Sequence, residues 1–180
     1  MKKAYKKIIF FDGDGTIWYP KKTKRTVEPH LIYKDVSIRD NNHHLHLMLT
    51  PKVIETLQEL KRRGVLIVLV STYPHQKKEA DLILNKKVKH FNLEKVFDGI
   101  YTARDYQEGK GEIIMNVLKK YKLPKARAVI LGDSYRRDYL SAKRIGVDAY
   151  LIETIYMKGR PRANNEKYII KEVEDLLNII

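Results

Sequence analysis

Residues 65–70, VLIVLV, form an unbroken aliphatic run that is followed by Ser71 and Thr72. A strand that is aliphatic along its whole length is typical of a parallel sheet with both faces buried. The segment before it predicts a helix, with Thr50 as its N-cap, Pro51 at its first position and Gly64 at its end. Its apolar stripe recurs at helical spacing through Val53, Ile54, Leu57 and Leu60. This strand and helix pair restricts the chain to folds that bury a parallel sheet beneath helices.

The same alternation continues along most of the chain. Further strands are expected at 7–11, 97–102, 128–131 and 149–152, with helices at 76–87, 111–121 and 136–145. An amphipathic helix is expected at 167–180. Strands that alternate with helices in this order predict an α/β fold, a Rossmann-like doubly wound and mainly parallel sheet. Ligands bind such sheets beyond the carboxyl ends of the strands.

Residues 19–50 interrupt this alternation. They are polar and lack helical periodicity, and residues 35–49 alternate on both sides of Asp40, Asn41 and Asn42, which predicts a small β-hairpin. We therefore expect one domain over residues 1–180, with 19–50 as a small insert after the first strand. His43, His44 and His46 are interpreted as solvated hairpin residues rather than a transition-metal site, and their contact with a substrate is left open.

The net charge of +14 and the pI of about 9.7 favour anionic partners, either phosphorylated metabolites or nucleic acid. The alternative is that lysine and arginine merely solvate helix faces, because the basic residues are spread along the chain. The absence of cysteine excludes disulfides and thiol chemistry. No apolar run approaches a membrane span of roughly 20 residues, so we expect a cytoplasmic protein without membrane contact; a homo-oligomer stays open.

Polar side chains follow three of the predicted strands directly. Asp12 and Asp14 follow the first strand within FFDGDGTIW, Ser71 and Thr72 follow the second, and Asp133 follows the strand at 128–131. Because the carboxyl ends of parallel strands share one edge of a sheet, these side chains are expected to meet there. The alternative for Asp12 and Asp14 is a helix-capping turn after a strand, and the alternative for Ser71 and Thr72 is an ordinary helix cap.

The acids suit hydrolysis of a phosphate monoester. Asp12 can attack phosphorus and bind a metal, which gives an aspartyl-phosphate intermediate. Asp14 lies on the same side of an extended chain, so it can protonate the leaving oxygen and later deprotonate water. Asp133 offers a second hard oxygen to Mg²⁺. Asp138 is expected in the outer shell, where it holds a metal-bound water or orients a lysine.

The remaining candidates are donors to the phosphate. The hydroxyl of Ser71 can donate to a phosphoryl oxygen, and Thr72 lies beside it as a further phosphate-binding residue. Lys110 stands in the sequence GKG before a predicted helix, where a phosphate can also meet the helix N-terminus. Its compact charge suits contact with both nucleophile and phosphate.

DGDGT, the strand ending in Ser71, Lys110 and GDSYRRD together resemble, in this order, the four motifs of the haloacid dehalogenase (HAD) superfamily of phosphohydrolases. The resemblance implies a Rossmann-like sheet, Mg²⁺ as cofactor and the roles given above. It also implies that the backbone carbonyl of Asp14 joins the metal ligands. DGDGTIW with Trp18 and Pro20 resembles the magnesium-dependent phosphatase-1 type, which implies little or no cap domain over the site.

The sequence therefore predicts a magnesium-dependent phosphatase. Its substrate is expected to be a phosphorylated small molecule or a phosphoprotein. A nucleic-acid-end phosphatase is the first alternative, prompted by the positive charge. A non-catalytic phosphate- or nucleic-acid-binding protein on the same fold is the alternative from another class.

Overall fold

The computed structural model describes residues 5–35, 38, 42–104, 110–157 and 168–180. Its centre is a six-stranded sheet of order β5-β4-β1-β6-β7-β8, in which every pairing is parallel. The strands are β1 (Ile8–Phe11), β4 (Leu66–Tyr73), β5 (Gly99–Arg104), β6 (Ala128–Gly132), β7 (Asp148–Ile152) and β8 (Ile169–Ile170). The predicted doubly wound parallel sheet is confirmed.

The first strand, β1, lies between β4 and β6, with Ile8 opposite both Leu66 and Ala128. The chain continues from β1 to β4 and β5 on one side, and then crosses to β6 and β7 on the other. This reversal makes the carboxyl end of β1 the topological switch point, where such sheets bind ligands. Asp12 is the first residue after β1 and therefore stands at that point.

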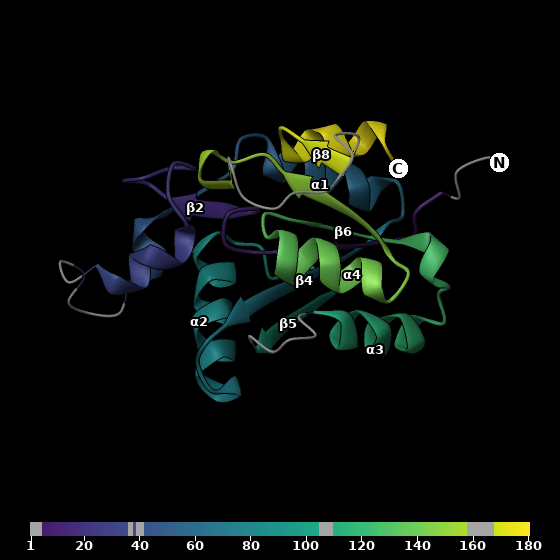
Figure 1. The fold of residues 1–180 in the computed structure, drawn as a ribbon, viewed down its shortest axis with the longest axis horizontal. Helices are drawn as coiled ribbons and strands as arrows, with labels where there is room; N and C mark the ends of the chain where they lie inside the picture. Colours follow the sequence, from purple (N-terminus) through teal and green to yellow (C-terminus); the bar gives the residue numbers. More distant parts are fainter. Residues whose placement is uncertain (1–4, 36–37, 39–41, 105–109, 158–167) are drawn as a thin grey trace.

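Helices cover both faces of the sheet (Figure 1). α1 (Val53–Arg62) and α2 (Lys77–His90) pack on one face, where Phe11 of β1 points, and α3 (Gly111–Tyr121) and α4 (Ser141–Arg144) pack on the other, where Phe10 points. Successive side chains of a strand face opposite ways, so each strand contributes to two apolar cores. This explains why β1, β4 and β6 read as continuous apolar runs rather than alternating ones.

The insert differs from the expected hairpin. β2 (Trp18–Pro20) pairs antiparallel with β3 (Leu47–Leu49), so the predicted second arm does form a strand, but with a partner near the first motif. The prediction that His43, His44 and His46 lie on a strand is wrong, because His43–His46 is a 3₁₀ helix. A second 3₁₀ helix spans Pro29–Lys34. The predicted turn at 40–42 and the arm before it lie largely outside the described residues.

Helix ends also differ from the sequence prediction. α1 begins at Val53 after Lys52, and the hydroxyl of Thr50 instead donates to the carbonyl oxygens of Thr16 and Ile17, at 2.9 and 3.2 Å. Thr50 thus ties α1 to the turn after β1 rather than capping the helix. β4 continues through Tyr73, so Ser71 and Thr72 belong to the strand and do not follow it.

Two segments that were predicted to be α-helices partly adopt other secondary structure. The helix expected at 136–145 begins as a π-helical segment, Tyr135–Leu140, before α4. The expected C-terminal helix is, where described, strand β8 followed by a 3₁₀ helix, Val173–Asn178. Ile170 extends the sheet at its edge while Val173 and Leu176 pack in the core, so tertiary packing overrides the helical pattern there. Among the described residues, no helix combines the length and apolar character needed to cross a membrane.

Candidate active site

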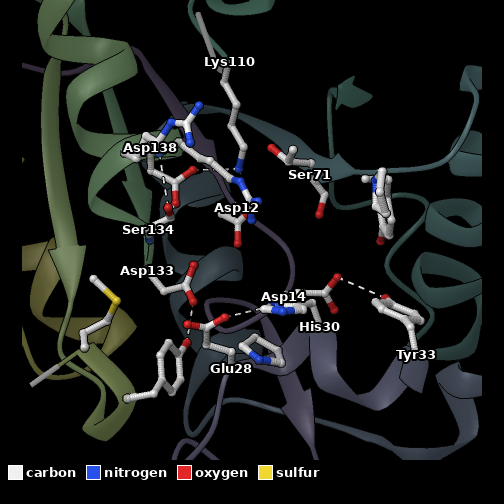
Figure 2. Close-up of a pocket in the computed structure, with 18 of the residues that line it drawn as sticks. Asp12, Asp14, Glu28, His30, Tyr33, Ser71, Lys110, Asp133, Ser134 and Asp138 are labelled. Atoms are coloured by element: carbon white, nitrogen blue, oxygen red, sulfur yellow. Dashed lines mark hydrogen bonds and ion pairs between the residues drawn. The ribbon is translucent and has the colours of Figure 1, made fainter. Parts of the chain in front are cut away.

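The carboxyl ends of β1, β4 and β6 open into a cavity of about 490 Å³. The fold brings every residue singled out above for chemistry to this cavity, although they come from positions far apart in the chain (Figure 2). They are Asp12, Asp14, Ser71, Thr72, Lys110, Asp133 and Asp138. None of His43, His44 and His46 lines it.

Three buried carboxylates lie close together in the site. Asp12, Asp133 and Asp138 each place one oxygen within 4.8 Å of the other two. Asp138, expected in the outer shell, therefore lies as close to this group as the two expected ligands do. The side chain of Asp14 is not part of this group and points toward Tyr33 instead (Figure 2).

Lys110 lies immediately before α3 and contacts two of these acids. Its Nζ donates to Oδ1 of Asp12 and lies 2.7 Å from Oδ1 of Asp138. When all three buried carboxylates are ionised, they carry an excess of two negative charges over the ammonium of Lys110. Such an excess is costly without a compensating cation, and carboxylate oxygens are ligands that Mg²⁺ prefers. The residues present thus fit a divalent cation.

The same crowding alters the pKa values. Burial raises the pKa of Asp12 to about 7, although the charge of Lys110 acts in the opposite direction. Burial and the neighbouring Asp12 also raise the pKa of Asp133 well above its usual range. Burial alone would lower the pKa of Lys110, but Asp12 and Asp138 outweigh it and raise that pKa. Strongly shifted acids in one cavity are typical of a functional site.

The loop after β1 leaves no room for side chains at its glycines. A Cβ on Gly13 would lie 3.0 Å from Oγ of Ser71. Gly15 has a φ of +88°, and a Cβ there would lie 2.4 Å from Oδ2 of Asp133. The glycines therefore allow the backbone to approach Ser71 on one side and Asp133 on the other.

Ser71 and Thr72 supply hydroxyls from β4. Ser71 is buried beside the loop after β1. The hydroxyl oxygen of Thr72 is buried and has no hydrogen-bond partner among the described residues, although Thr72 lines the cavity. A buried polar atom without a partner is costly, and a ligand in the cavity could supply one.

Sequence reasoning missed Lys87, which holds the side chain of Asp14. Its Nζ donates to both Oδ1 and Oδ2 of Asp14, each at 2.7 Å, and Lys87 is 1% exposed. One signal was present in the sequence: Lys87 occupies the buried stripe of α2 beside Ala80, Leu84 and Val88. A charged residue on an apolar helix face needs a partner.

The mouth of the cavity is rich in cationic side chains. Arg137 and Lys34 stand near His30, and together with burial their charges lower the pKa of His30. The charge of Asp14 acts on this pKa in the opposite direction, and Oε2 of Glu28 lies 3.2 Å from Nδ1 of His30. The cationic or titratable residues at the mouth are His30, Lys34, His75, Arg136 and Arg137. His75 follows the strand of Ser71 and could be expected here from the sequence, but the group as a whole could not, because its members come from three separate segments.

Tyr156 lines the cavity beside Asp133, to which its hydroxyl donates. Burial and the charge of Asp133 raise the pKa of Tyr156, so it stays a donor. This α/β protein thus offers, at the switch point of a parallel sheet, carboxylates suited to a cation and a lysine and hydroxyls suited to an anionic group.

The chain belongs to the haloacid dehalogenase-like hydrolase family, whose pattern it matches over residues 2–152. This agrees with the resemblance of its motifs, whereas the magnesium-dependent phosphatase-1 type stays a prediction. The chain is 27% identical to the haloacid dehalogenase-like hydrolase domain-containing protein 3 of Xenopus laevis over 151 residues, which are 81% of this chain and 56% of the relative.

Two further relatives are enzymes by name. The pyrophosphatase PpaX of Bacillus mycoides is 28% identical over 79% of this chain and 66% of its own length. The phosphoglycolate phosphatase of Vibrio parahaemolyticus is 24% identical over 73% of this chain and 56% of its own length. The chain thus spans between about half and two thirds of the curated relatives it matches.

Solved structures show the same fold. A HAD phosphatase from Thermococcus onnurineus superposes with a TM-score of 0.67 at 20% identity, over 96% of this chain and 97% of the other. A haloacid dehalogenase-like family protein from Streptococcus pneumoniae gives a TM-score of 0.65 at 20% identity, over 97% and 98% of the two chains.

Proposed function

We propose that this protein is a magnesium-dependent phosphatase that hydrolyses phosphate monoesters through an aspartyl-phosphate intermediate on Asp12. The observation that carries this proposal is the buried group of Asp12, Asp133 and Asp138, which faces the single ammonium of Lys110. Asp12 and Asp133 would hold Mg²⁺ together with the backbone carbonyl of Asp14, and Asp138 would lie beside them. When bound, Mg²⁺ supplies charge neutralisation to the phosphoryl oxygens.

The first half of the reaction transfers the phosphoryl group to the protein. An oxygen of Asp12 forms a bond to phosphorus while the bond to the leaving oxygen breaks, and Asp14 gives that oxygen its proton. Lys110 holds the nucleophile in position through its contact with Oδ1 of Asp12. The hydroxyls of Ser71 and Thr72 donate to the phosphoryl oxygens.

The second half releases inorganic phosphate. A water oxygen bonds to phosphorus, Asp14 accepts the proton of that water, and the bond between phosphorus and Asp12 breaks. Asp14 thus acts first as an acid and then as a base, and it ends each cycle with the proton it began with. This role requires a carboxyl group at the cavity wall, which is where Asp14 lies.

The cationic mouth narrows the proposed substrate to small phosphorylated molecules with a second acidic group. The positive charges of Lys34 and Arg137 flank His30 beyond the three buried acids. A second carboxylate or phosphate on the substrate would be attracted there. The names of the relatives, pyrophosphatase and phosphoglycolate phosphatase, refer to compounds of this kind.

Hydrolysis of 4-nitrophenyl phosphate tests the reaction. We expect turnover with Mg²⁺, none with a chelator, and a loss of at least about a thousandfold in Asp12→Asn. A variant that kept full activity would show that Asp12 is not the nucleophile. A screen of phosphorylated acids, sugar phosphates, phosphopeptides and phosphorylated oligonucleotides then tests the substrate. Turnover of oligonucleotides alone would favour the nucleic-acid-end phosphatase, and no turnover of any ester would favour a binding protein.

A further inference from the structure

Lys87 and Asp14 form a buried ion pair from two segments that are 73 residues apart in the chain. Besides its two bonds to the carboxylate, Nζ of Lys87 lies 2.8 Å from the hydroxyl of Tyr73 and contacts the hydroxyl of Tyr33. The same Nζ stands 5.8, 5.0 and 4.9 Å from the ring centres of Trp18, Tyr33 and Tyr73. Oxygens and aromatic rings thus surround this ammonium.

The carboxylate of Asp14 is held from other directions as well. Nε1 of Trp18 donates to Oδ1 at 2.9 Å, and the hydroxyl of Tyr33 donates to Oδ2 at 3.2 Å. Each oxygen therefore accepts one bond from Lys87 and one from an aromatic side chain. Four bonds leave the carboxylate a single orientation, in which its side chain is 15% exposed.

Stability alone does not explain this arrangement. An apolar residue in place of a buried ion pair is often neutral or stabilising, because both charges lose their hydration. Lys87 also sits beside Leu84 and Val88 on the apolar stripe of α2, where a leucine or methionine would fit the pattern. A charged pair in such a place, one member of which is the proposed proton-transfer group Asp14, points to a functional role.

Lys87 cannot meet a substrate itself. Asp14 lines the cavity, whereas Lys87 lies behind it and does not. Any effect of Lys87 on the reaction must therefore pass through Asp14. The residues that hold the Lys87–Asp14 pair come from four elements. Trp18 lies on β2, Tyr33 on the 3₁₀ helix of the insert, Tyr73 on β4 and Lys87 on α2.

We propose that Lys87 is a positioning residue for the acid–base step, and that Tyr33 links this function to the insert. The proposal rests on the proposed role of Asp14. Lys87 holds the side chain of Asp14 at the cavity wall. The four bonds described above belong to the ionised form, which takes a proton from water; in the protonated form, the O–H that serves the leaving oxygen replaces one of them. The insert, through Tyr33, completes the set of bonds that hold it.

Two esters with different leaving groups test this positioning. Phenolate is a good leaving group only when it receives a proton, whereas 2,4-dinitrophenolate leaves without one. Loss of a general acid therefore slows phosphoryl transfer from phenyl phosphate but not from 2,4-dinitrophenyl phosphate. In Lys87→Met, which keeps the length of the side chain, we expect kcat/KM for phenyl phosphate to fall about a hundredfold, and that for 2,4-dinitrophenyl phosphate to fall less than about threefold. The matched control is Lys86→Met, because Lys86 is exposed on the same helix.

A second signature comes from the hydrolysis of the intermediate, which needs Asp14 as base for every substrate. Lys87→Met should release a rapid burst of dinitrophenolate followed by slow turnover. Equal losses of kcat/KM for both esters in a variant that still folds would mean that Lys87 only supports packing, and would overturn the proposal. The burst should be absent in Lys86→Met.

Tyr33→Phe covers the case in which Lys87→Met fails to fold, because it keeps the ring and removes one bond to Asp14. It should lower kcat/KM for phenyl phosphate about tenfold and leave that for the dinitrophenyl ester unchanged. Equal effects on both esters would overturn the proposal. Asp14→Asn tests the acid–base role of Asp14 separately from the positioning role of Lys87. If this variant lowers kcat/KM equally for both esters, Asp14 is not the general acid, and the positioning role of Lys87 is excluded with it.

Discussion

Nζ of Lys110 lies 2.7 Å from Oδ1 of Asp138, and both side chains are 1% exposed. The same Nζ contacts Asp12, so one ammonium joins the proposed nucleophile to an acid from the segment after β6. Oδ2 of Asp138 meanwhile accepts a hydrogen bond from the backbone N–H of Ser134 at 2.9 Å. Asp138 thus fixes Lys110 relative to the loop that carries Asp133.

Asp138→Asn should weaken the site without unfolding it. The amide oxygen can still accept from Ser134, but one of the three negative charges is lost and Lys110 is no longer held on that side. We expect Mg²⁺ affinity or kcat to fall about tenfold to a hundredfold, measured by calorimetric titration with Mg²⁺ and by phosphatase assay. Glu94→Gln, an exposed acid remote from the cavity, is the control and should leave both values unchanged.

Mg²⁺ affinity should depend on pH through Asp12. Its pKa is about 7 without metal, so the protein below pH 7 holds a proton that Mg²⁺ must displace. Lowering the pH from about 8 to about 6 should therefore weaken Mg²⁺ binding by at least about tenfold, and the raised pKa of Asp133 adds to this. Calorimetric titrations at several pH values measure the effect. An affinity independent of pH over this range would contradict the assignment of these acids as ligands.

Gly15→Ala should damage the site through a steric clash. Its Cβ would lie 2.4 Å from Oδ2 of Asp133, and its φ of +88° adds backbone strain. We expect a loss of roughly 1–3 kcal/mol in the free energy of unfolding, together with a large loss of Mg²⁺ affinity. Gly64→Ala is a matched control, because Gly64 has a φ of +70° and no atom within 4 Å of its Cβ position. That variant should lose stability of about 1 kcal/mol and keep its activity.

The cationic mouth should distinguish acidic from neutral substrates. Lys34→Gln and Arg136→Gln, at exposed positions of the mouth, should raise KM for phosphoglycolate about threefold to tenfold. KM for ethyl phosphate, which lacks the second acid, should stay the same. The effect should also diminish at high salt, because exposed charges are screened. Equal changes for both substrates would show that the mouth does not recognise a second acidic group.

Much of the fold could be predicted because the signals are local. The apolar runs that became β1, β4, β6 and β7 identify themselves within a few residues. Asp12, Asp14 and Asp133 follow two of these strands, so the parallel sheet alone brings them to one edge. Lys110 and Ser71 also reached the expected cavity. The helix ends were less predictable, because tertiary contacts rather than helix propensity determine the conformation of Thr50 and of residues 135–140.

The insert and the surroundings of Asp14 could not be predicted in the same way. β3 pairs with β2 across the insert, and no local pattern identifies that partner. Lys87 lies on a helix whose periodicity is visible, but its partner Asp14 is 73 residues away. An ion pair between distant segments leaves only an indirect trace in the sequence, in this case a charge on an apolar face.

Local sequence patterns were sufficient to predict the class of fold and the carboxylates, hydroxyls and lysine that line the cavity. Strand and helix periodicity and the residues just after a strand are properties of neighbouring positions. The folded protein is needed to see that Asp138 joins Asp12 and Asp133, that Lys87 holds Asp14, and that cationic side chains gather at the mouth. These relationships depend on burial and on charges from separate segments. The interaction energies of such charges become large only when packing brings them close together and excludes water.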